Sequence, residues 1–188
     1  FDAVMGDPTL DPERVAHAEV RAVEKIGERA HFELATFYRH VDGFIKPRAG
    51  MFTNREDIDV YGLDVIPRAH VHRRVELGAG YQLIEAESMV SNDPLDFLPR
   101  HKLDGWVRVE LGRGISALGR VKYISSALDQ GNEVGNYELV EGNLTAALGK
   151  RYLAVLRVDD ALDRRPELRA GFPSAGRVIS LVFQGSWE

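Results

Sequence analysis

The chain has 188 residues, of which 44% are hydrophobic and 28% are charged, with a formal net charge of -5 at pH 7. This is the composition of a folded protein and not of a disordered one. Lys and Arg are scattered along an acidic chain, which argues against a nucleic-acid-binding surface, and the absence of cysteine excludes disulfides and thiolate metal sites.

Hydrophobic residues alternate with polar or small residues along most of the chain, which is the period of a β-strand. No apolar run approaches the ~18 residues of a membrane-spanning helix, but a strand that crosses a membrane needs only ~9–11 residues. The alternation predicts about nine strands. In chain order they cover residues 15–23, 32–38, 61–65, 75–83, 103–111, 117–123, 140–148, 153–158 and 179–187.

The segment from Val75 to Leu83 shows the pattern most clearly, because every second residue is apolar and the residues between them are Glu, Gly, Gly and Gln. Successive side chains of a strand point to opposite faces, so one face of the predicted sheet is apolar and the other is polar or bare. Residues 103–111, 117–123 and 179–187 follow the same pattern.

The connections between the predicted strands alternate in length. Short ones are expected at residues 26–28, 67–73, 112–114 and 149–151, and long ones, rich in turn-forming residues, at 41–57, 85–101, 126–137 and 160–176. In an antiparallel sheet every second connection returns to the same end of the strands, so short turns gather at one end and long loops at the other. Outer-membrane barrels have short periplasmic turns and long external loops. The predicted fold class is therefore all-β, an antiparallel transmembrane β-barrel segment.

The strand count also predicts how the chain is placed. If loop 160–176 is external, the last strand descends to the periplasmic rim, and counting back puts residues 1–13 in an external loop. A complete bacterial barrel has an even number of strands with both ends in the periplasm, so we expect further strands upstream of Phe1.

Several short segments resemble signatures of the TonB-dependent receptors of bacterial outer membranes. Residues 6–14 are similar to the N-P-x-L-x-P-E signature of that family, with Asp7 in place of the usual Asn. The matching residues are Pro8, Leu10, Pro12 and Glu13. In the family this signature lies in an external loop before a descending strand, where the strand count independently places it here.

Two further stretches near the C-terminus resemble the same family. Residues 157–164 are similar to its V-x-N-L-x-D stretch on the penultimate strand, with Asp160 in place of Asn and Ala161 in place of Leu. Residues 171–177 resemble its G-Y-P-x-P-G-R stretch before the last strand. The matching residues are Gly171, Pro173, Gly176 and Arg177.

The last predicted strand resembles the signal that barrel-assembly machinery reads, an alternating strand with a terminal aromatic residue. The residues of this signal are Ile179, Leu181, Phe183 and Trp187. Glu188 follows the aromatic residue, whereas chains of the family usually end on it.

The resemblance implies that residues 1–188 are the C-terminal part of a barrel of about 22 strands, with a plug domain in its lumen. It implies a multi-pass receptor of the bacterial outer membrane for a scarce nutrient of the ferric siderophore, haem or cobalamin class. The expected partners are outer-membrane lipid and lipopolysaccharide, the plug and the remaining strands of the same receptor, the TonB system through the plug region, and the barrel-assembly machinery. We expect no cofactor and no enzymatic activity, since no nucleophile context or phosphate-binding loop is recognisable.

The polar face of the predicted sheet would line the lumen, where its side chains either contact a plug or line a hydrated wall. The candidates are Glu76, Trp106, Arg108, Glu110, Arg120 and Lys122. Trp106 lies on the polar face, whereas most other aromatic residues of the predicted strands lie on the apolar face and suit an interfacial girdle. We expect it to pack against a plug.

Other interpretations stay open at this point. His70 and His72 have the spacing of two metal ligands on one strand face, but a basic turn from Arg68 to Arg74, near lipid head groups, is favoured because no third ligand is evident. A plug-less, porin-like barrel would produce the same alternation. A soluble all-β binding module would also do so, with its apolar face on an ordinary core.

Overall fold

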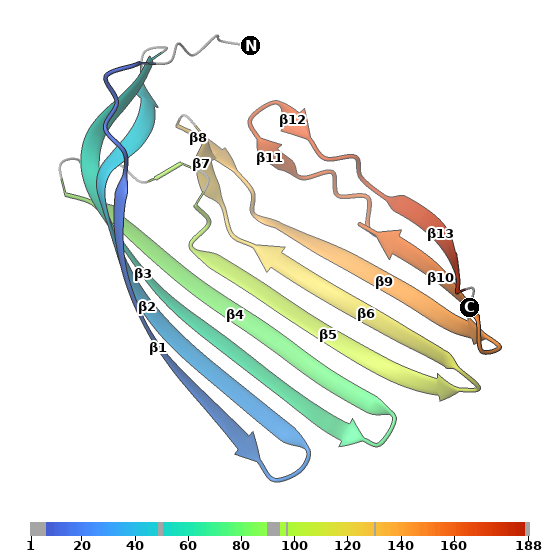
Figure 1. The fold of residues 1–188 in the computed structure, drawn as a ribbon. Helices are drawn as coiled ribbons and strands as arrows, with labels where there is room; N and C mark the ends of the chain where they lie inside the picture. The colour runs from blue at the N-terminus through green and yellow to red at the C-terminus, as the bar shows by residue number, and fades with distance from the viewer. Residues whose placement is uncertain (1–6, 49–50, 90–94, 97, 130, 187–188) are drawn as a thin grey trace.

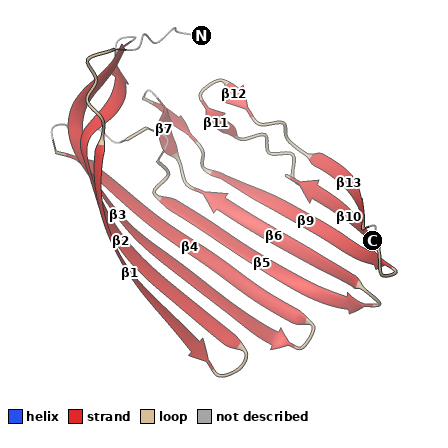
Figure 2. Cartoon of the chain, in the orientation of Figure 1, coloured by secondary structure: helices blue, strands red, loops and turns tan. Residues whose placement is uncertain are grey.

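A computed structural model of the chain describes residues 7–48, 51–89, 95–96, 98–129 and 131–186, apart from the side chains of residues 46–48, 51, 55, 56 and 168. Every regular element in these ranges is a strand, as Figure 2 shows in red. Within the same ranges, no helix has the length and hydrophobicity needed to cross a membrane.

Nine strands form one continuous sheet, open at β1 and β13 (Figure 1). They are β1 (Arg14–Ile26), β2 (Ala30–Arg48), β3 (Met51–His72), β4 (Val75–Ser88), β5 (His101–Gly112), β6 (Ile115–Ile124), β9 (Tyr137–Leu148), β10 (Tyr152–Asp159) and β13 (Val178–Gly185). Each pairs antiparallel with its neighbours in this order. The sheet is an up-and-down meander, which confirms the predicted antiparallel architecture.

Two small hairpins account for the gaps in the numbering of the sheet. The first is formed by β7 (Ala127–Asp129) and β8 (Asn132–Val134), and the second by β11 (Glu167–Arg169) and β12 (Phe172–Pro173). Both lie inside connections that the sequence predicts as long loops. The buried carboxylate of Asp129 accepts a hydrogen bond from the Ala170 N–H at 2.8 Å, so the two loops are joined.

Apart from the two-residue link between β2 and β3, the connections are sorted by length along the two ends of the sheet. Turns at residues 27–29, 73–74, 113–114 and 149–151 lie along one end, and the two hairpins with the N-terminal segment lie at the other (Figure 1). This is the sorting that the alternating loop lengths predict. It follows from antiparallel pairing of consecutive strands, because each strand reverses the direction of the one before it.

The predicted long loop at 41–57 is wrong. β2 continues to Arg48 and β3 begins at Met51, so the two strands extend past the rest of the sheet as a paired ribbon. The pairing shifts register between Val41 and Ile45, where Gly43 has a φ of 70°. Turn-forming residues in this segment suggested a loop, but a bulge absorbs the glycine, and strand pairing requires only backbone groups.

The predicted turn at 67–73 is also too long, since β3 runs to His72 and the turn consists of Arg73 and Arg74. His70 and His72 therefore lie at the end of a strand and not in a basic turn. Pro67 misled the prediction. It has no N–H to donate, and the β3–β4 pairing accordingly skips from Val65 to Arg68 without ending the strand.

The register carries the alternation from strand to strand. Residues that lie opposite each other in an antiparallel pair point to the same face. Val107 lies opposite Leu77 on β4 and Gly119 on β6. On the outer strands of the same face, Val20 is 73% exposed and Phe183 is 68% exposed.

The apolar face has no second layer to cover it in this chain. The buried apolar residues of the described part are Ala35, Val41, Ile58 and Val134, and none of them lies on that face. A β-sandwich would bury such a face against another sheet about 10 Å away. An apolar surface of this extent needs lipid or another part of the protein against it.

Candidate functional site

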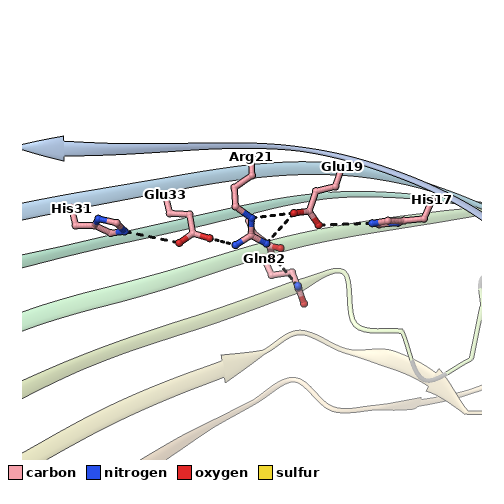
Figure 3. A network of polar contacts seen from close by, with 7 residues as sticks. His17, Glu19, Arg21, His31, Glu33 and Gln82 are labelled. Carbon is pink, nitrogen blue, oxygen red and sulfur yellow. Dashed lines mark hydrogen bonds and ion pairs between the residues drawn. The ribbon is translucent and has the colours of Figure 1, made fainter.

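A chain of ion pairs follows β1 and β2 on the polar face of the sheet (Figure 3). The Arg21 Nε and Nη2 atoms donate to Glu19 Oε1 at 3.1 and 3.0 Å, and Nη1 donates across the strand pair to Glu33. His17 Nε2 lies 3.8 Å from the Glu19 carboxylate, and His31 Nε2 lies 4.0 Å from that of Glu33. One guanidinium therefore joins carboxylates of two neighbouring strands.

A second group of ion pairs joins β5, β6 and β9 on the same face. Arg120 donates to both carboxylate oxygens of Asp104, from Nε at 2.5 Å and from Nη2 at 3.0 Å. The Lys122 Nζ atom donates to Glu141 Oε1 at 2.7 Å. All four side chains are only partly accessible. These four charges of the wall are therefore paired across strands.

A shallow hollow of about 310 Å³ lies beside this second group. Its lining residues are Asp64, Ile66, Gly80, Tyr81, Gln82, Lys102, Leu103, Asp104, Arg120, Lys122, Tyr123 and Ile124. The Gln82 amide donates to Asp64 Oδ1 at 2.9 Å, so both lining carboxylates are hydrogen-bonded within the wall. The described residues contain no cluster of three or more His, Asp or Glu that could hold a metal ion.

The register places the six predicted lumen candidates on this polar face. They are Glu76, Trp106, Arg108, Glu110, Arg120 and Lys122. Glu76 lies opposite Arg108, and Trp106 lies opposite Arg120. The Trp106 indole covers Gly78, where an added Cβ would come within 2.4 Å of the ring. The wall of this chain already packs against the indole, and a contact with a plug stays a prediction.

Several partners in these pairs were not among the predicted lumen candidates, although the alternation places Gln82 and Asp104 on the polar face. Glu33, Asp64, Gln82 and Asp104 each bond to a polar residue of a neighbouring strand. The face of Asp104 follows from the sequence, because Asp104 precedes Trp106 by two residues and therefore shares its face. The identity of its partner depends on register, which the sequence of one strand does not contain.

The two C-terminal family-like stretches fold into one compact loop. Asp160 is buried, and its carboxylate accepts the N–H groups of Arg164 at 3.1 Å and Arg165 at 3.2 Å. Asp163 Oδ1 accepts the Arg165 Nε–H at 3.1 Å and the Arg177 N–H at 3.0 Å. These two hydrogen bonds hold the pKa of Asp163 below its ordinary value. Asp160 and Asp163 both have positive φ, which Asp tolerates better than most residues.

Gly176 is required where the two stretches meet. It is buried with a φ of 78°, and a Cβ there would come within 2.3 Å of Asp163 Oδ1 and 2.8 Å of Arg165 Cγ. Gly171 also has a φ of 78°, in the turn between β11 and β12, and Pro173 on β12 pairs with Glu167. Residues that look like separate signatures in the sequence thus close a single loop.

The N-terminal family-like stretch is clamped to the extended ribbon of β2 and β3. Glu13 Oε1 accepts the Ile45 N–H at 2.7 Å. Asn54 accepts the Asp11 N–H and donates to the Asp11 carbonyl, both at 2.8 Å, and it also donates to the Gly43 carbonyl at 2.7 Å. Pro8, Leu10 and Pro12 belong to the segment that this clamp holds.

The last strand presents its predicted residues on the apolar face. Ile179, Leu181 and Phe183 are exposed and lie opposite Val158, Leu156 and Ala154 of β10. Trp187 lies outside the described residues. Whether this strand serves as an assembly signal stays a prediction.

Comparisons with known proteins give strong structural matches only. No family model matches the sequence, and no curated protein matches it. A structure of the copper transporter OprC superposes with a TM-score of 0.84 at 14% identity, over 98% of this chain and 34% of the other. The ferric-catecholate import receptor Fiu from E. coli K12 gives 0.73 at 16% identity, over 94% and 28%. The pyoverdine outer-membrane receptor FpvA from Pseudomonas aeruginosa gives 0.74 at 13% identity, over 95% and 30%.

The chain has the fold of a receptor-barrel wall. The resemblance to TonB-dependent receptors is thereby confirmed at the level of the fold. The chain spans about a third of the length of the receptors that it matches, so it corresponds to one part of their structure. In a receptor-barrel wall the two faces of the sheet meet different surroundings, which accounts for one exposed apolar face and one face of paired charges.

Proposed function

We propose that residues 1–188 form the C-terminal part of the barrel of a TonB-dependent outer-membrane receptor, and that the whole protein imports a scarce metal nutrient. The observation that carries the proposal is the nine-stranded meander, with short turns at one end and, apart from the ribbon of β2 and β3, long connections at the other. Its match to the barrels of import receptors supports the same conclusion. Antiparallel sheets of this size without a covered face are expected in barrels that sit in lipid.

The apolar face of the sheet is proposed to face lipid, and the polar face the lumen. The bilayer offers no hydrogen-bond partners, so the backbone groups of the wall must pair between strands, and each strand from β2 to β10 of the sheet has a paired neighbour on both sides. The open edges at β1 and β13 would then pair with the remaining strands of the same protein. Paired charges such as Arg120 with Asp104 fit a lumen that contacts a plug, because a paired side chain can bond another domain without exposing an unpaired charge.

The imported nutrient is proposed to be a metal chelate of the ferric siderophore class. The matched receptors include proteins for ferric catecholate, ferric yersiniabactin and pyoverdine, and a copper transporter. Energy for transport would come from the TonB system acting on a plug, with assembly by the barrel-assembly machinery. Haem and cobalamin belong to the same proposed range of ligands.

Uptake by intact cells tests the proposal directly. A Gram-negative host expressing the full polypeptide that contains this chain would be given a panel of ⁵⁵Fe-labelled siderophores, with matched hosts that lack TonB or lack the polypeptide. We expect uptake of at least one chelate that requires both. The charge-preserving variant Lys122→Arg serves as a control for expression, since it keeps the ion pair with Glu141.

Two outcomes would contradict the proposal and identify the alternative. Steady ion conductance through the purified protein in a planar bilayer, without TonB-dependent uptake, would indicate a porin-like barrel. Recovery of the full polypeptide in the soluble fraction without detergent would indicate an all-β binding module.

A further inference from the structure

The four short turns of the sheet carry most of their charge as cations. Residues 27–29, 73–74, 113–114 and 149–151 contain six basic side chains and one acidic side chain, that of Glu28. The basic residues are Arg29, Arg73, Arg74, Arg113, Lys150 and Arg151, and all are exposed. The chain as a whole has a net charge of -5, so this end of the sheet, called here the turn rim, has the opposite sign to the rest.

The cations of the turn rim are unpaired, in contrast to Arg21 and Arg120 of the wall. Within the described ranges, none of the six side chains forms an ion pair or a side-chain hydrogen bond. The carbonyls of Arg29, Arg74 and Arg151 accept the N–H groups of residues outside their own turns. Arg21 and Arg120 on the wall each bond a carboxylate. A set of exposed cations without internal partners is available to an external anion.

Exposed apolar side chains lie directly beside each turn. Ile26, Val71, Leu111 and Leu148 are all exposed, and each stands within three residues of a basic turn residue. Figure 1 places the four turns in a row along one end of the sheet, so the strand ends that carry these apolar residues also lie in a row. An apolar band bordered by cations matches a lipid layer bordered by anionic head groups.

We propose that the turn rim binds the phosphate head groups of anionic phospholipids of the phosphatidylglycerol class. The inference rests on the proposed function, which puts these turns at the periplasmic surface of the membrane. Arginine is the principal cation of the rim, and its guanidinium bonds two phosphate oxygens at once. Zwitterionic phospholipids offer no net charge to balance the rim, whereas each phosphatidylglycerol brings one negative charge.

The test uses the full polypeptide that contains this chain, purified in detergent and inserted into lipid nanodiscs. Insertion is read first, from heat-dependent mobility in gels, with phosphatidylcholine as the only lipid. Binding of phosphatidylglycerol is then titrated by native mass spectrometry. The variant Arg73→Gln/Arg113→Gln removes two rim cations. The matched control Arg14→Gln/Arg39→Gln removes two exposed cations away from the turns, which form no ion pair with the part of the chain that the structure describes.

We expect the rim variant to lose roughly fivefold in phosphatidylglycerol affinity for each cation removed. The control variant should bind like the parent protein, and added salt should weaken binding of the parent more than that of the rim variant. Equal affinities of the two double variants, or equal binding of phosphatidylglycerol and phosphatidylcholine, would overturn the inference while leaving the receptor proposal intact. Failure of the protein to insert into any bilayer would overturn the receptor proposal itself.

Discussion

Val107→Arg is the substitution that tests most directly which face of the sheet meets lipid. Val107 lies in the middle of β5, between Leu77 on β4 and Gly119 on β6, and it is 37% exposed. Neither neighbouring side chain can bond a guanidinium, and an added Cβ at Gly119 would be 3.7 Å from Val107. The introduced charge would therefore lie on the apolar face of the sheet without a partner.

The expected loss of folding free energy follows from the depth of residue 107 in the bilayer. A charged residue on the lipid face costs ~2–4 kcal/mol at the bilayer midplane and about 0–1 kcal/mol near the interface. Val107 stands near the centre of its strand, away from both ends, so we expect a loss of about 3 kcal/mol. This corresponds to a roughly 150-fold change in the folding equilibrium.

The measurement is reversible unfolding of the full polypeptide by denaturant in liposomes. Ile66→Arg is the matched control, because Ile66 lies at a similar distance from its turn but on the polar face, opposite Glu33. That variant should cost less than about 1 kcal/mol, since its cation would meet carboxylates and water. Similar unfolding free energies for Val107→Arg and the parent protein, or a larger loss for Ile66→Arg, would refute the assignment of the two faces.

Three further predictions concern the loop end and the polar face. Gly176→Ala should loosen the loop around Asp163 and speed the limited proteolysis of that loop, because the added Cβ would clash with Asp163 and Arg165. Gly149 also has a positive φ but has open space around it, so Gly149→Ala should add only backbone strain of about 1 kcal/mol. Equal effects of the two substitutions would contradict the steric argument. A double-mutant cycle with Asp104→Asn and Arg120→Met should give a coupling of about 0.2–1 kcal/mol, because both side chains are partly exposed, and a value above about 2 kcal/mol would show that solvent screening was misjudged. The pKa of Asp163 is lowered in the folded loop, so its ionised carboxylate stabilises the loop at pH values above the ordinary carboxyl pKa. This stabilisation is lost as pH falls through the lowered pKa, so acid should speed proteolytic cleavage of the loop in the parent protein. An unchanged acid response in Asp163→Asn would contradict this cause.

The alternation of residues predicted the strands and their faces well, and it failed where turn-forming residues lie inside paired strands. Gly43 and Pro67 suggested loops, yet β2 and β3 run through both positions. A bulge accommodates the first, and a skipped pairing position accommodates the second. Backbone pairing with a neighbouring strand overrode the local preference, and that neighbour is not visible in a window of a few residues.

The sequence by itself determined which residues are apolar, which alternate with them, and where the chain reverses over short turns. Those features decide an all-β meander and its two unlike faces, because side-chain direction in a strand has a period of two. Only the tertiary structure decided the pairs, such as Arg21 with Glu33 and Asp163 with Arg177, which are separated along the chain. Register and loop closure bring them together, and both depend on the positions of whole strands relative to one another.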